Sequence, residues 1–326
     1  MRYHEIRVLE VVRETAEACS LVLDIPPDLA TEFTYRPGQY LTVRVPHGIA
    51  RCYSLASSPL HDVPPKVTVK RMRDGRVSNW ICDHVTAGTV LEILPPAGHF
   101  TPDSLDADLL LLAGGSGITP VMSILTSALT GGTGRIVLVY ANRDEESVIF
   151  ADDLRRLAAA HPDRLHVTHW FDVENGPPTP DALRALVEPY ADFEAFVCGP
   201  DAYMTVVEKA LEDVGVERIH VERFESLEAD PVEGGRDATV EVTLDGQTHR
   251  FDWPAGTRLL DLLIGKGLNA PFSCRQGTCA SCACRITEGD VDLLHNEVLE
   301  EEDFAEGYIL ACQAVALTDR VVVTYD

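Results

Sequence analysis

The stretch Cys274–Cys282 has the sequence C-R-Q-G-T-C-A-S-C, and a fourth cysteine, Cys312, follows downstream in L-A-C-Q. This is C-x4-C-x2-C with one distant cysteine, the spacing that holds a plant-type [2Fe–2S] cluster. Such a cluster needs four thiolates that converge on two irons, which a tight loop and a returning strand can supply. We therefore predict that Cys274, Cys279, Cys282 and Cys312 are the metal ligands.

Other uses of these cysteines fit the pattern less well. A structural zinc site usually has two C-x2-C pairs, or one pair with two histidines, and a Rieske centre replaces two cysteines by histidines. A disulfide framework is typical of small secreted domains, whereas this chain has 326 residues and its first residues lack the apolar stretch of a signal peptide. The remaining cysteines are scattered, which favours reduced thiols in a cytoplasmic protein; they are Cys19, Cys52, Cys82, Cys198 and Cys284.

Length and charge limit the classes of function. A chain of 326 residues with 45% hydrophobic content is long enough for two or three packed domains. Its net charge of -25 argues against nucleic acid as a partner, and no apolar stretch is long enough to span a membrane. The run Glu297–Glu306 is strongly acidic. It is either a solvated helix face or a surface that steers a positively charged partner, with Glu300, Glu301 and Asp303 as candidates for that role.

Residues 1–102 have the pattern of a β domain. Apolar and polar residues alternate in four segments, Arg7–Arg13, Ser20–Ile25, Tyr40–Val45 and Lys66–Arg71. Proline and glycine separate these segments. Many short strands with such breaks predict a closed antiparallel β-barrel.

Residues 103–225 change to the pattern of an α/β domain. Leu109–Ala113 is continuously apolar, as a strand buried on both faces should be. Further strands and helices are expected to alternate after it: a helix from Pro120, a strand at Arg135–Tyr140, a helix around Ala151–Ala160, and strands at Leu165–Trp170 and Ala195–Cys198. This alternation predicts a doubly wound parallel sheet.

The third domain is predicted at residues 237–326, after a polar linker at 226–236 that contains proline and two glycines. It opens with two alternating segments on either side of Asp245-Gly246, a strong signal for a two-residue hairpin turn. Leu259–Lys266 is expected to form a short helix before the cysteine loop.

Two segments of the first domain carry groups suited to a phosphorylated ring cofactor. Arg51-Cys-Tyr-Ser54 supplies a cation, an aromatic face and a hydroxyl, although the tetrapeptide alone is a weak signal. Gly75–Trp80 places a turn glycine before an expected helix, whose free N–H groups bind anions. The alternative is that Ser78 is an ordinary helix N-cap.

Two segments of the second domain are suited to a nucleotide. Ala113–Pro120 reads A-G-G-S-G-I-T-P after a buried strand, and its glycines let the backbone approach a pyrophosphate. It is not G-x-G-x-x-G, so the signal is only moderately specific. Cys198-Gly199-Pro200 ends a second apolar strand, and open α/β sheets bind ligands at the carboxyl ends of their strands.

Together and in this order, R-x-Y-S, G-x-x-S, G-G-S-G-I-T-P, C-G-P and the cysteine motif resemble the ferredoxin–NADP reductase superfamily over the whole chain. A C-terminal ferredoxin domain resembles the reductase components of oxygenases. Tyr140–Asp144, Trp253-Pro and Val321–Asp326 are most similar to the branch that serves bacterial 3-ketosteroid 9α-hydroxylation. The reductases of phenylacetyl-CoA epoxidase and phthalate dioxygenase are similar but more distant. The resemblance implies a flavin-binding β-barrel, a nicotinamide-binding α/β domain and an α+β ferredoxin domain of the β-grasp type.

The resemblance also implies roles for individual residues. Arg51 would pair with the flavin pyrophosphate, Tyr53 would stack on the isoalloxazine, and Ser54 would hydrogen-bond near N5. Ser54 and Cys198 would be the catalytic residues, and Phe224 would lie at the flavin edge. The other implied cofactor-binding residues are Lys70, Gly75, Val77 and Ser78 on the side of FAD, and Gly114, Gly115, Ser116, Gly117, Thr119, Cys198, Gly199 and Pro200 around the nicotinamide.

The function implied is transfer of electrons from NADH through FAD and the [2Fe–2S] cluster to a terminal oxygenase. NADH is expected rather than NADPH, because carboxylates at Asp144, Glu145 and Glu146 would repel a 2′-phosphate, although Arg143 could bind one. A different oxygenase is the alternative partner. A redox sensor or electron-storage module is the alternative from another class, and it would not need a full nicotinamide domain.

Overall fold

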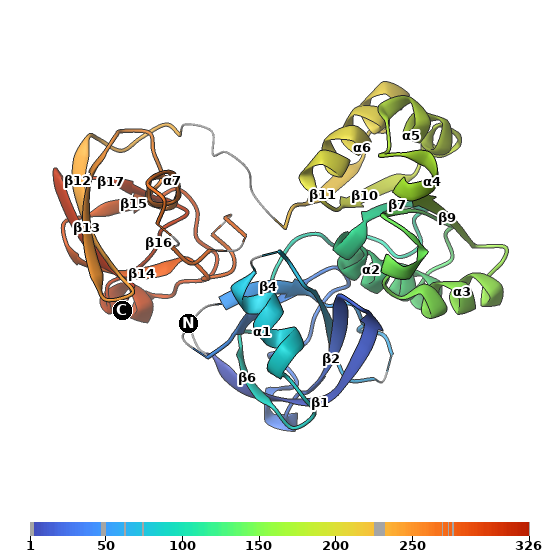
Figure 1. Ribbon diagram of the computed structural model, residues 1–326, viewed down its shortest axis with the longest axis horizontal. Coiled ribbons are helices and arrows are strands. Elements are labelled where there is room, and N and C mark those ends of the chain that lie inside the picture. Colours follow the sequence, from blue (N-terminus) through green and yellow to red (C-terminus); the bar gives the residue numbers. More distant parts are fainter. Residues whose placement is uncertain are drawn as a thin grey trace. The chain divides into compact units, whose positions relative to one another are not determined.

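The computed structural model describes residues 3–46, 50–61, 63–73, 75–224, 232–268, 270–272, 274–275 and 277–325 (Figure 1). By packing, the chain divides into two compact units. The larger comprises His4–Leu41 and Tyr53–Glu225, and the smaller comprises Met1–Tyr3, Thr42–Cys52 and Ser226–Asp326. Residues 226–231 of the predicted linker lie outside the described part of the chain.

The N-terminal region forms one six-stranded antiparallel sheet, drawn from blue to cyan in Figure 1. Its strands are β1 (His4–Thr15), β2 (Ala18–Asp24), β3 (Tyr40–Arg44), β4 (Ala50–Ser54), β5 (Lys66–Lys70) and β6 (Val90–Ile93). They lie in the order β4-β3-β6-β1-β2-β5. A bridge between Leu55, which follows β4, and Val67 of β5 joins the two ends of this order, so the sheet closes. The predicted barrel is confirmed, and α1 (Arg76–His84) packs against β5.

The second sheet is five-stranded and entirely parallel, in the order β11-β10-β7-β8-β9. Its strands are β7 (Leu109–Gly114), β8 (Ile136–Asn142), β9 (Leu165–Phe171), β10 (Glu194–Cys198) and β11 (Ile219–Glu222). The helices are α2 (Ile118–Gly131), α3 (Ala151–Ala160), α4 (Asp172–Asn175), α5 (Pro180–Val187) and α6 (Asp201–Val214). The predicted doubly wound sheet is confirmed. Strand β11 was not predicted from the sequence.

Both faces of this sheet are covered by helices, which explains why β7 is apolar without alternation. Leu109 and Leu111 of β7 pack in one core with α2 and α3. Leu110 and Leu112 point to the other face and pack in a second core with α5 and α6. All four leucines are fully buried. Successive residues of a strand point to opposite faces, so a strand covered on both sides must be apolar at every position.

The C-terminal region, orange to red in Figure 1, is of the α+β class, as expected. Its main sheet has the order β13-β12-β18-β14-β16, and β15 pairs with β17. The elements are β12 (Ala238–Leu244), β13 (Gln247–Trp253), α7 (Leu259–Gly265), β14 (Ala283–Glu288), β15 (Val291–Leu293), α8 (Glu301–Ala305), β16 (Tyr308–Leu310), β17 (Ala314–Ala316) and β18 (Arg320–Thr324). Asp245 and Gly246 both have positive φ, which confirms the predicted hairpin turn.

The longest helices among the described residues are α2 and α6, with 14 residues each. At about 1.5 Å per residue they are shorter than the roughly 30 Å hydrocarbon core of a bilayer. None of the helices described could therefore cross a membrane.

Candidate functional site

The two nucleotide-type loops of the parallel sheet lie against each other at its carboxyl edge. Cys198 at the end of β10 pairs with Ala113 of β7, so the loops that follow these strands leave the sheet side by side. A Cβ on Gly117 would lie 2.1 Å from the carbonyl oxygen of Cys198, and one on Gly199 would lie 3.1 Å from Cα of Gly114. The predicted Gly114–Thr119 and Cys198–Pro200 segments are thus brought together by backbone contact, which only glycine permits.

The loop after β7 is a short 3₁₀ helix, Gly115–Gly117, that runs directly into α2. Gly115 has φ +52, and Thr119 is buried with its hydroxyl donating to the carbonyl of Ser116 at 3.0 Å. Helix α2 begins at Ile118, two residues before the predicted start. The arrangement leaves the amino end of α2 at the carboxyl edge of the sheet, where a pyrophosphate is favoured by the free N–H groups.

A polar cluster of Ser54, Cys198 and Glu222 lies within the larger unit. Ser54 ends β4 and is 3% exposed, and its hydroxyl donates to Oε2 of Glu222 at 3.3 Å. Glu222 ends β11 and is the register partner of Cys198 on β10. Cys198 is fully buried, and burial together with the nearby Glu222 raises the pKa of its thiol. The structure therefore unites the two predicted catalytic residues with a carboxyl group.

Glu222 has an unusual protonation state. Desolvation raises the pKa of its carboxyl to about 8, and the hydrogen bond from Ser54 offsets only part of this rise. At neutral pH the group is mainly a carboxylic acid, so it can donate as well as accept a hydrogen bond. A carboxyl poised near neutrality at the ligand edge of an α/β sheet is a candidate for moving a proton.

Glu222 was not singled out from the sequence. The residues Ile219-His-Val-Glu222 are short and mixed in polarity, so they did not stand out as a strand. The available signal was the apolar–polar alternation that places His220 and Glu222 on one face, just before the predicted Phe224. Phe224 follows β11 and is 39% exposed.

The predicted flavin residues of the barrel lie on β4, β5 and α1. Arg51 and Tyr53 are both half-buried residues of β4. Lys70 ends β5, and its Nζ would lie 3.4 Å from a Cβ on Gly115, so it faces the nucleotide loop. This places a cation beside the segment predicted to approach a phosphate.

The N-cap of α1 is not the residue that the alternative interpretation expected. Gly75, not Ser78, is the N-cap of α1. Ser78 lies in the first turn, is 7% exposed, and its hydroxyl accepts from the backbone N–H of Met72 at 3.2 Å. Val77 beside it is also buried. The N-cap role of Ser78 is therefore wrong, and the side chain instead holds the turn that leads into the helix.

The cysteine loop of the smaller unit has a sharply curved backbone. Arg275, Gly277 and Ala280 have φ of +54, +80 and +54. Positive φ is uncommon for residues other than glycine, so its occurrence at Arg275 and Ala280 of one short loop marks a tightly constrained backbone. Cys279, Cys282 and Cys312 are 2% exposed, and Cys274 is half-buried.

Backbone-to-sulfur hydrogen bonds link the four cysteines in two pairs. The N–H of Cys274 donates to Sγ of Cys279 and the N–H of Cys312 donates to Sγ of Cys282, both at 3.4 Å. Nε2 of Gln313 donates to Sγ of Cys312 at 3.6 Å. Donors aimed at sulfur are the environment that an iron-bound thiolate requires, so these residues fit the cluster. Among the described residues, no three metal-binding side chains are already arranged as a site for a metal ion.

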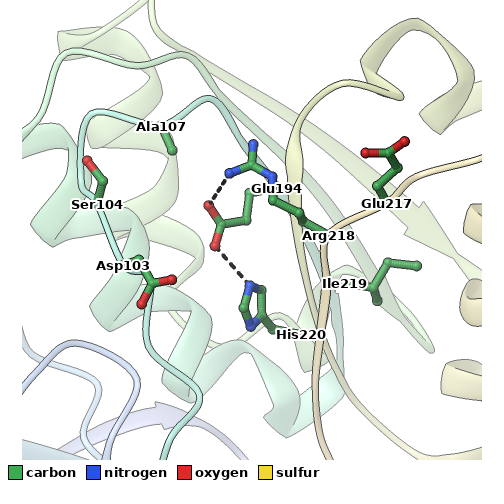
Figure 2. Close-up of a pocket in the computed structure, with 8 residues that line it drawn as sticks. All are labelled: Asp103, Ser104, Ala107, Glu194, Glu217, Arg218, Ile219 and His220. Atoms are coloured by element: carbon green, nitrogen blue, oxygen red, sulfur yellow. Dashed lines mark hydrogen bonds and ion pairs between the residues drawn. The ribbon is translucent and has the colours of Figure 1, made fainter.

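A hollow of about 390 Å³ lies at the opposite, amino edge of the parallel sheet (Figure 2). Glu194, which begins β10, is 3% exposed and lines it. Its carboxylate accepts from Nη1 of Arg218 at 3.3 Å and pairs with Nε2 of His220 at 2.8 Å, as Figure 2 shows. The hollow is thus lined by an ion pair whose acid is buried and whose arginine is exposed, and it is separate from the glycine loops at the carboxyl edge.

Three family models match the chain in sequence. An oxidoreductase FAD-binding domain matches residues 6–101, an oxidoreductase NAD-binding domain matches 111–209, and a 2Fe-2S iron-sulfur cluster binding domain matches 242–317. The chain is therefore an oxidoreductase that binds FAD, a nicotinamide nucleotide and a [2Fe–2S] cluster. These are the cofactors that the sequence motifs predicted.

Curated relatives extend over almost the whole chain. The ferredoxin reductase component of 3-ketosteroid-9-alpha-monooxygenase from Rhodococcus rhodochrous is 51% identical, covering 98% of this chain and 96% of the relative. The protein of the same description from Mycolicibacterium smegmatis is 52% identical, covering 99% and 97%. Among solved structures, phthalate dioxygenase reductase has a TM-score of 0.64 at 25% identity, covering 99% and 98%. The chain belongs to the family of ferredoxin reductase components of monooxygenases.

The half-buried Glu222, whose carboxyl is desolvated, predicts a specific dependence of stability on pH. Its pKa is about 8 in the folded chain, against 4.5 for the ordinary value. Between these pH values the folded state holds a proton that the unfolded state has lost, so stability should fall as pH rises. The loss is at most about tenfold in the unfolding equilibrium per pH unit. Glu222→Gln should flatten this dependence in thermal unfolding measured from pH 5 to 8.

Glu217→Gln is the matched control, because Glu217 lines the hollow at the other edge of the sheet. It should leave the pH dependence as in the wild type. An unchanged pH profile in Glu222→Gln would show that this carboxyl is ionised in the folded protein.

Proposed function

We propose that the chain is the NADH-dependent reductase component of a two-component 3-ketosteroid 9α-hydroxylase, and that its partner is the terminal oxygenase of that system. The observation that carries the proposal is identity of 51% and 52% to two reductases of this description over nearly the full length of each chain. A component of the 1,2-phenylacetyl-CoA epoxidase of Escherichia coli is only 32% identical over 99% of the chain, which makes that system the second candidate.

The proposed site residues take the roles that their positions allow. When bound, FAD would supply the conversion of a two-electron hydride from NADH into single electrons, and the iron–sulfur cluster would supply one-electron transfer. Ser54 and Cys198 would border the reacting rings, while Glu222 would hold or move a proton at Oε2, where the hydroxyl of Ser54 donates. The glycine loops would orient the nicotinamide, and Phe224 would shield the flavin edge. The N–H groups at the start of α1, with Arg51, would hold the flavin pyrophosphate.

The three-domain division at residues 1–102, 103–225 and 237–326, with its linker at 226–236, belongs to the same proposal, as does a cytoplasmic location. Each of the three family models matches within one of these ranges. None of the nine cysteines is paired in a disulfide, which suits a reducing compartment.

The partner can be tested directly. Purified candidate oxygenases would be added to the holoprotein with NADH, and hydroxylation of each substrate measured. The 3-ketosteroid oxygenase should give the highest coupled rate. Coupling only to a phenylacetyl-CoA or aromatic-ring oxygenase would overturn the steroid assignment, and no steady NADH-dependent reduction of an artificial acceptor would favour the electron-storage alternative.

The cluster ligands predict different outcomes for two nearby cysteines. Cys279→Ser should leave FAD bound and reducible by NADH but abolish most reduction of one-electron protein acceptors, because it removes a ligand of the exit cluster. Cys284→Ser is the matched control: this buried residue of β14 is not needed for C-x4-C-x2-C. Absorbance of the cluster and reduction of the partner measure both. Loss of the cluster in Cys284→Ser would contradict the ligand set.

The loop after β8 predicts a preference for NADH. Nε of Arg143 lies 2.8 Å from a carboxylate oxygen of Asp144, so the guanidinium that could bind a 2′-phosphate already forms an ion pair. Asp144 also accepts from the N–H of Ser147 at 2.9 Å, which fixes its position. kcat/KM should be roughly tenfold or more higher for NADH than for NADPH, because a 2′-phosphate would have to compete with this pair.

Arg143→Ala should then change the two kcat/KM values by similar factors. A selective loss with NADPH would instead identify Arg143 as a ligand of the 2′-phosphate.

The structure changes which acids of the Glu297–Glu306 run are candidates for steering. The N–H of Glu300 donates to the side chain of Asp303 at 3.0 Å, and the two form the capping box of α8. Asp303 is 8% exposed. Its role is structural, so the expectation that it takes part in steering is revised. Glu301, Glu302 and Glu306 are exposed and remain candidates, although Oε2 of Glu306 also lies 3.7 Å from Nη2 of Arg285.

Changing Glu301, Glu302 and Glu306 together to Gln should slow reduction of the oxygenase several-fold at low ionic strength. The effect should fade at high salt, because exposed charges act over about 10 Å at 0.1 M and are screened beyond it. Stopped-flow kinetics over a salt series measures this, with NADH-to-flavin transfer as an internal control. Asp303→Ala should instead destabilise the domain by about 1 kcal/mol, because it removes the acceptor for the N–H of Glu300. An oxygenase reduction rate in the triple variant that equals the wild type at every salt concentration would leave the run as a solvated helix face.

A further inference from the structure

Two cysteines of the barrel, outside the cluster loop, are in contact. Sγ of Cys19 lies 3.5 Å from Sγ of Cys82. Cys19 belongs to β2, where it is the register partner of Val69 on β5. Cys82 lies in the last turns of α1, and its thiol points to the carbonyl oxygen of the same Val69 at 3.8 Å. The pair therefore joins the wall of the barrel to the helix that packs on it.

The two thiols differ in exposure and in acidity. Cys19 is 7% exposed, whereas Cys82 is half-buried and can be reached from solvent. The hydrogen bond from Cys19, helped by the positive charge of Arg71, lowers the pKa of Cys82, and the same contact raises the pKa of Cys19. This is the asymmetry of a dithiol in which one sulfur reacts first and the other follows.

We propose that Cys19 and Cys82 are a redox-active dithiol, which a hydroperoxide oxidises to a disulfide that ties α1 to the barrel wall. The thiolate of Cys82 attacks the peroxide oxygen and becomes a sulfenic acid, with release of an alcohol, or of water when the oxidant is hydrogen peroxide. The thiol of Cys19 then attacks the sulfenic sulfur of Cys82. The disulfide forms, and the hydroxyl group of the sulfenic acid leaves as water. Two thiols lose two electrons in total, and the peroxide gains them.

Little movement is needed to form the bond. A disulfide has its sulfur atoms about 2.05 Å apart, so the two atoms must approach by roughly 1.5 Å from their present 3.5 Å. Cys82 is near the carboxyl end of α1, where the helix ends at His84. A small shift of this end, or a change of side-chain rotamer, supplies the approach without disturbing β2, whose hydrogen bonds to β1 and β5 hold it on both sides.

The bond would act on the flavin through the other end of α1. Gly75 caps that end, and Val77 and Ser78 lie in its first turn. A covalent tie between α1 and β2 restricts the separation of the helix from the barrel, so release of FAD should slow. This second part rests on the proposed role of the turn in holding the flavin pyrophosphate, whereas the disulfide itself does not.

Peptide mapping of the oxidised holoprotein tests the disulfide. Hydrogen peroxide, and diamide as a thiol-specific oxidant, would be added in increasing amounts before free thiols are alkylated. Arg13, Lys66 and Arg76 place Cys19 and Cys82 in separate tryptic peptides, so the linked species is recognised by its mass. We expect the Cys19–Cys82 peptide to form in both treatments and to disappear on reduction with dithiothreitol.

Two variants define the order of the reaction. Cys82→Ser should abolish the linked peptide and leave Cys19 unoxidised. Cys19→Ser should instead let Cys82 accumulate as sulfenic and sulfinic acids, because no thiol remains to resolve it. Cys19→Ala replaces this variant if the serine hydroxyl disturbs the barrel. Cys284→Ser is the control and should form the disulfide as in the wild type. Two thiols that both remain alkylatable after diamide, or Cys82 oxidised singly in the wild type, would overturn the dithiol.

The rate of FAD release, followed by fluorescence after dilution, tests the coupling. We expect release to slow several-fold in the oxidised protein, to recover with dithiothreitol, and to be unaffected by oxidant in Cys82→Ser. A disulfide that forms without any change in FAD release would overturn the coupling through α1. Peptide mapping needs neither NADH nor an oxygenase. It can therefore succeed or fail independently of the experiment that tests the reductase assignment.

Discussion

The carboxyl edge of the parallel sheet depends on backbone contacts that leave no room for a side chain. The β7 and β10 loops meet where Gly117 faces the carbonyl of Cys198 and Gly199 faces Gly114. Any Cβ there would force the loops apart, and the amino end of α2 would move with them. The pairing of β10 with β11 then brings Glu222 beside Cys198. The polar cluster and the phosphate-type loop therefore meet at the same edge of the sheet, positioned by two neighbouring contacts of β10.

The polar cluster of Ser54, Cys198 and Glu222 consists of groups that are neutral near pH 7. Ser54 comes from a barrel strand, and Cys198 and Glu222 come from neighbouring strands of the sheet. Their burial keeps the thiol and the carboxyl protonated near neutral pH. Groups that stay neutral avoid the electrostatic penalty that burial of a fixed negative charge would impose. The site thus favours neutral hydrogen-bonding groups over a strongly charged acid–base pair.

The sequence predicted the fold where local pattern and tertiary environment agree. Leu109–Ala113 could only be a strand covered on both faces, and Asp245-Gly246 could only be a tight turn between strands. Prediction from the sequence failed where contacts between residues distant in the chain determine the structure. Strand β11 is four residues long and gains its order from β10, and the pKa of Glu222 arises from neighbours far apart in the chain. Asp303 looked like surface charge, because a capping box and a solvated acidic face have the same composition. The Cys19–Cys82 contact joins residues that are 63 positions apart, and no spacing rule relates them.

The buried Glu194 at the amino edge of the parallel sheet has a consequence for how such a protein evolves. Its partners Arg218 and His220 hold β10 and β11 together at the ends that face away from the glycine loops. Strand pairing is thus secured at one edge of the sheet, while the glycine loops meet at the opposite edge. Substitutions in those loops can therefore accumulate without loosening the pairing of β10 and β11 at their amino ends.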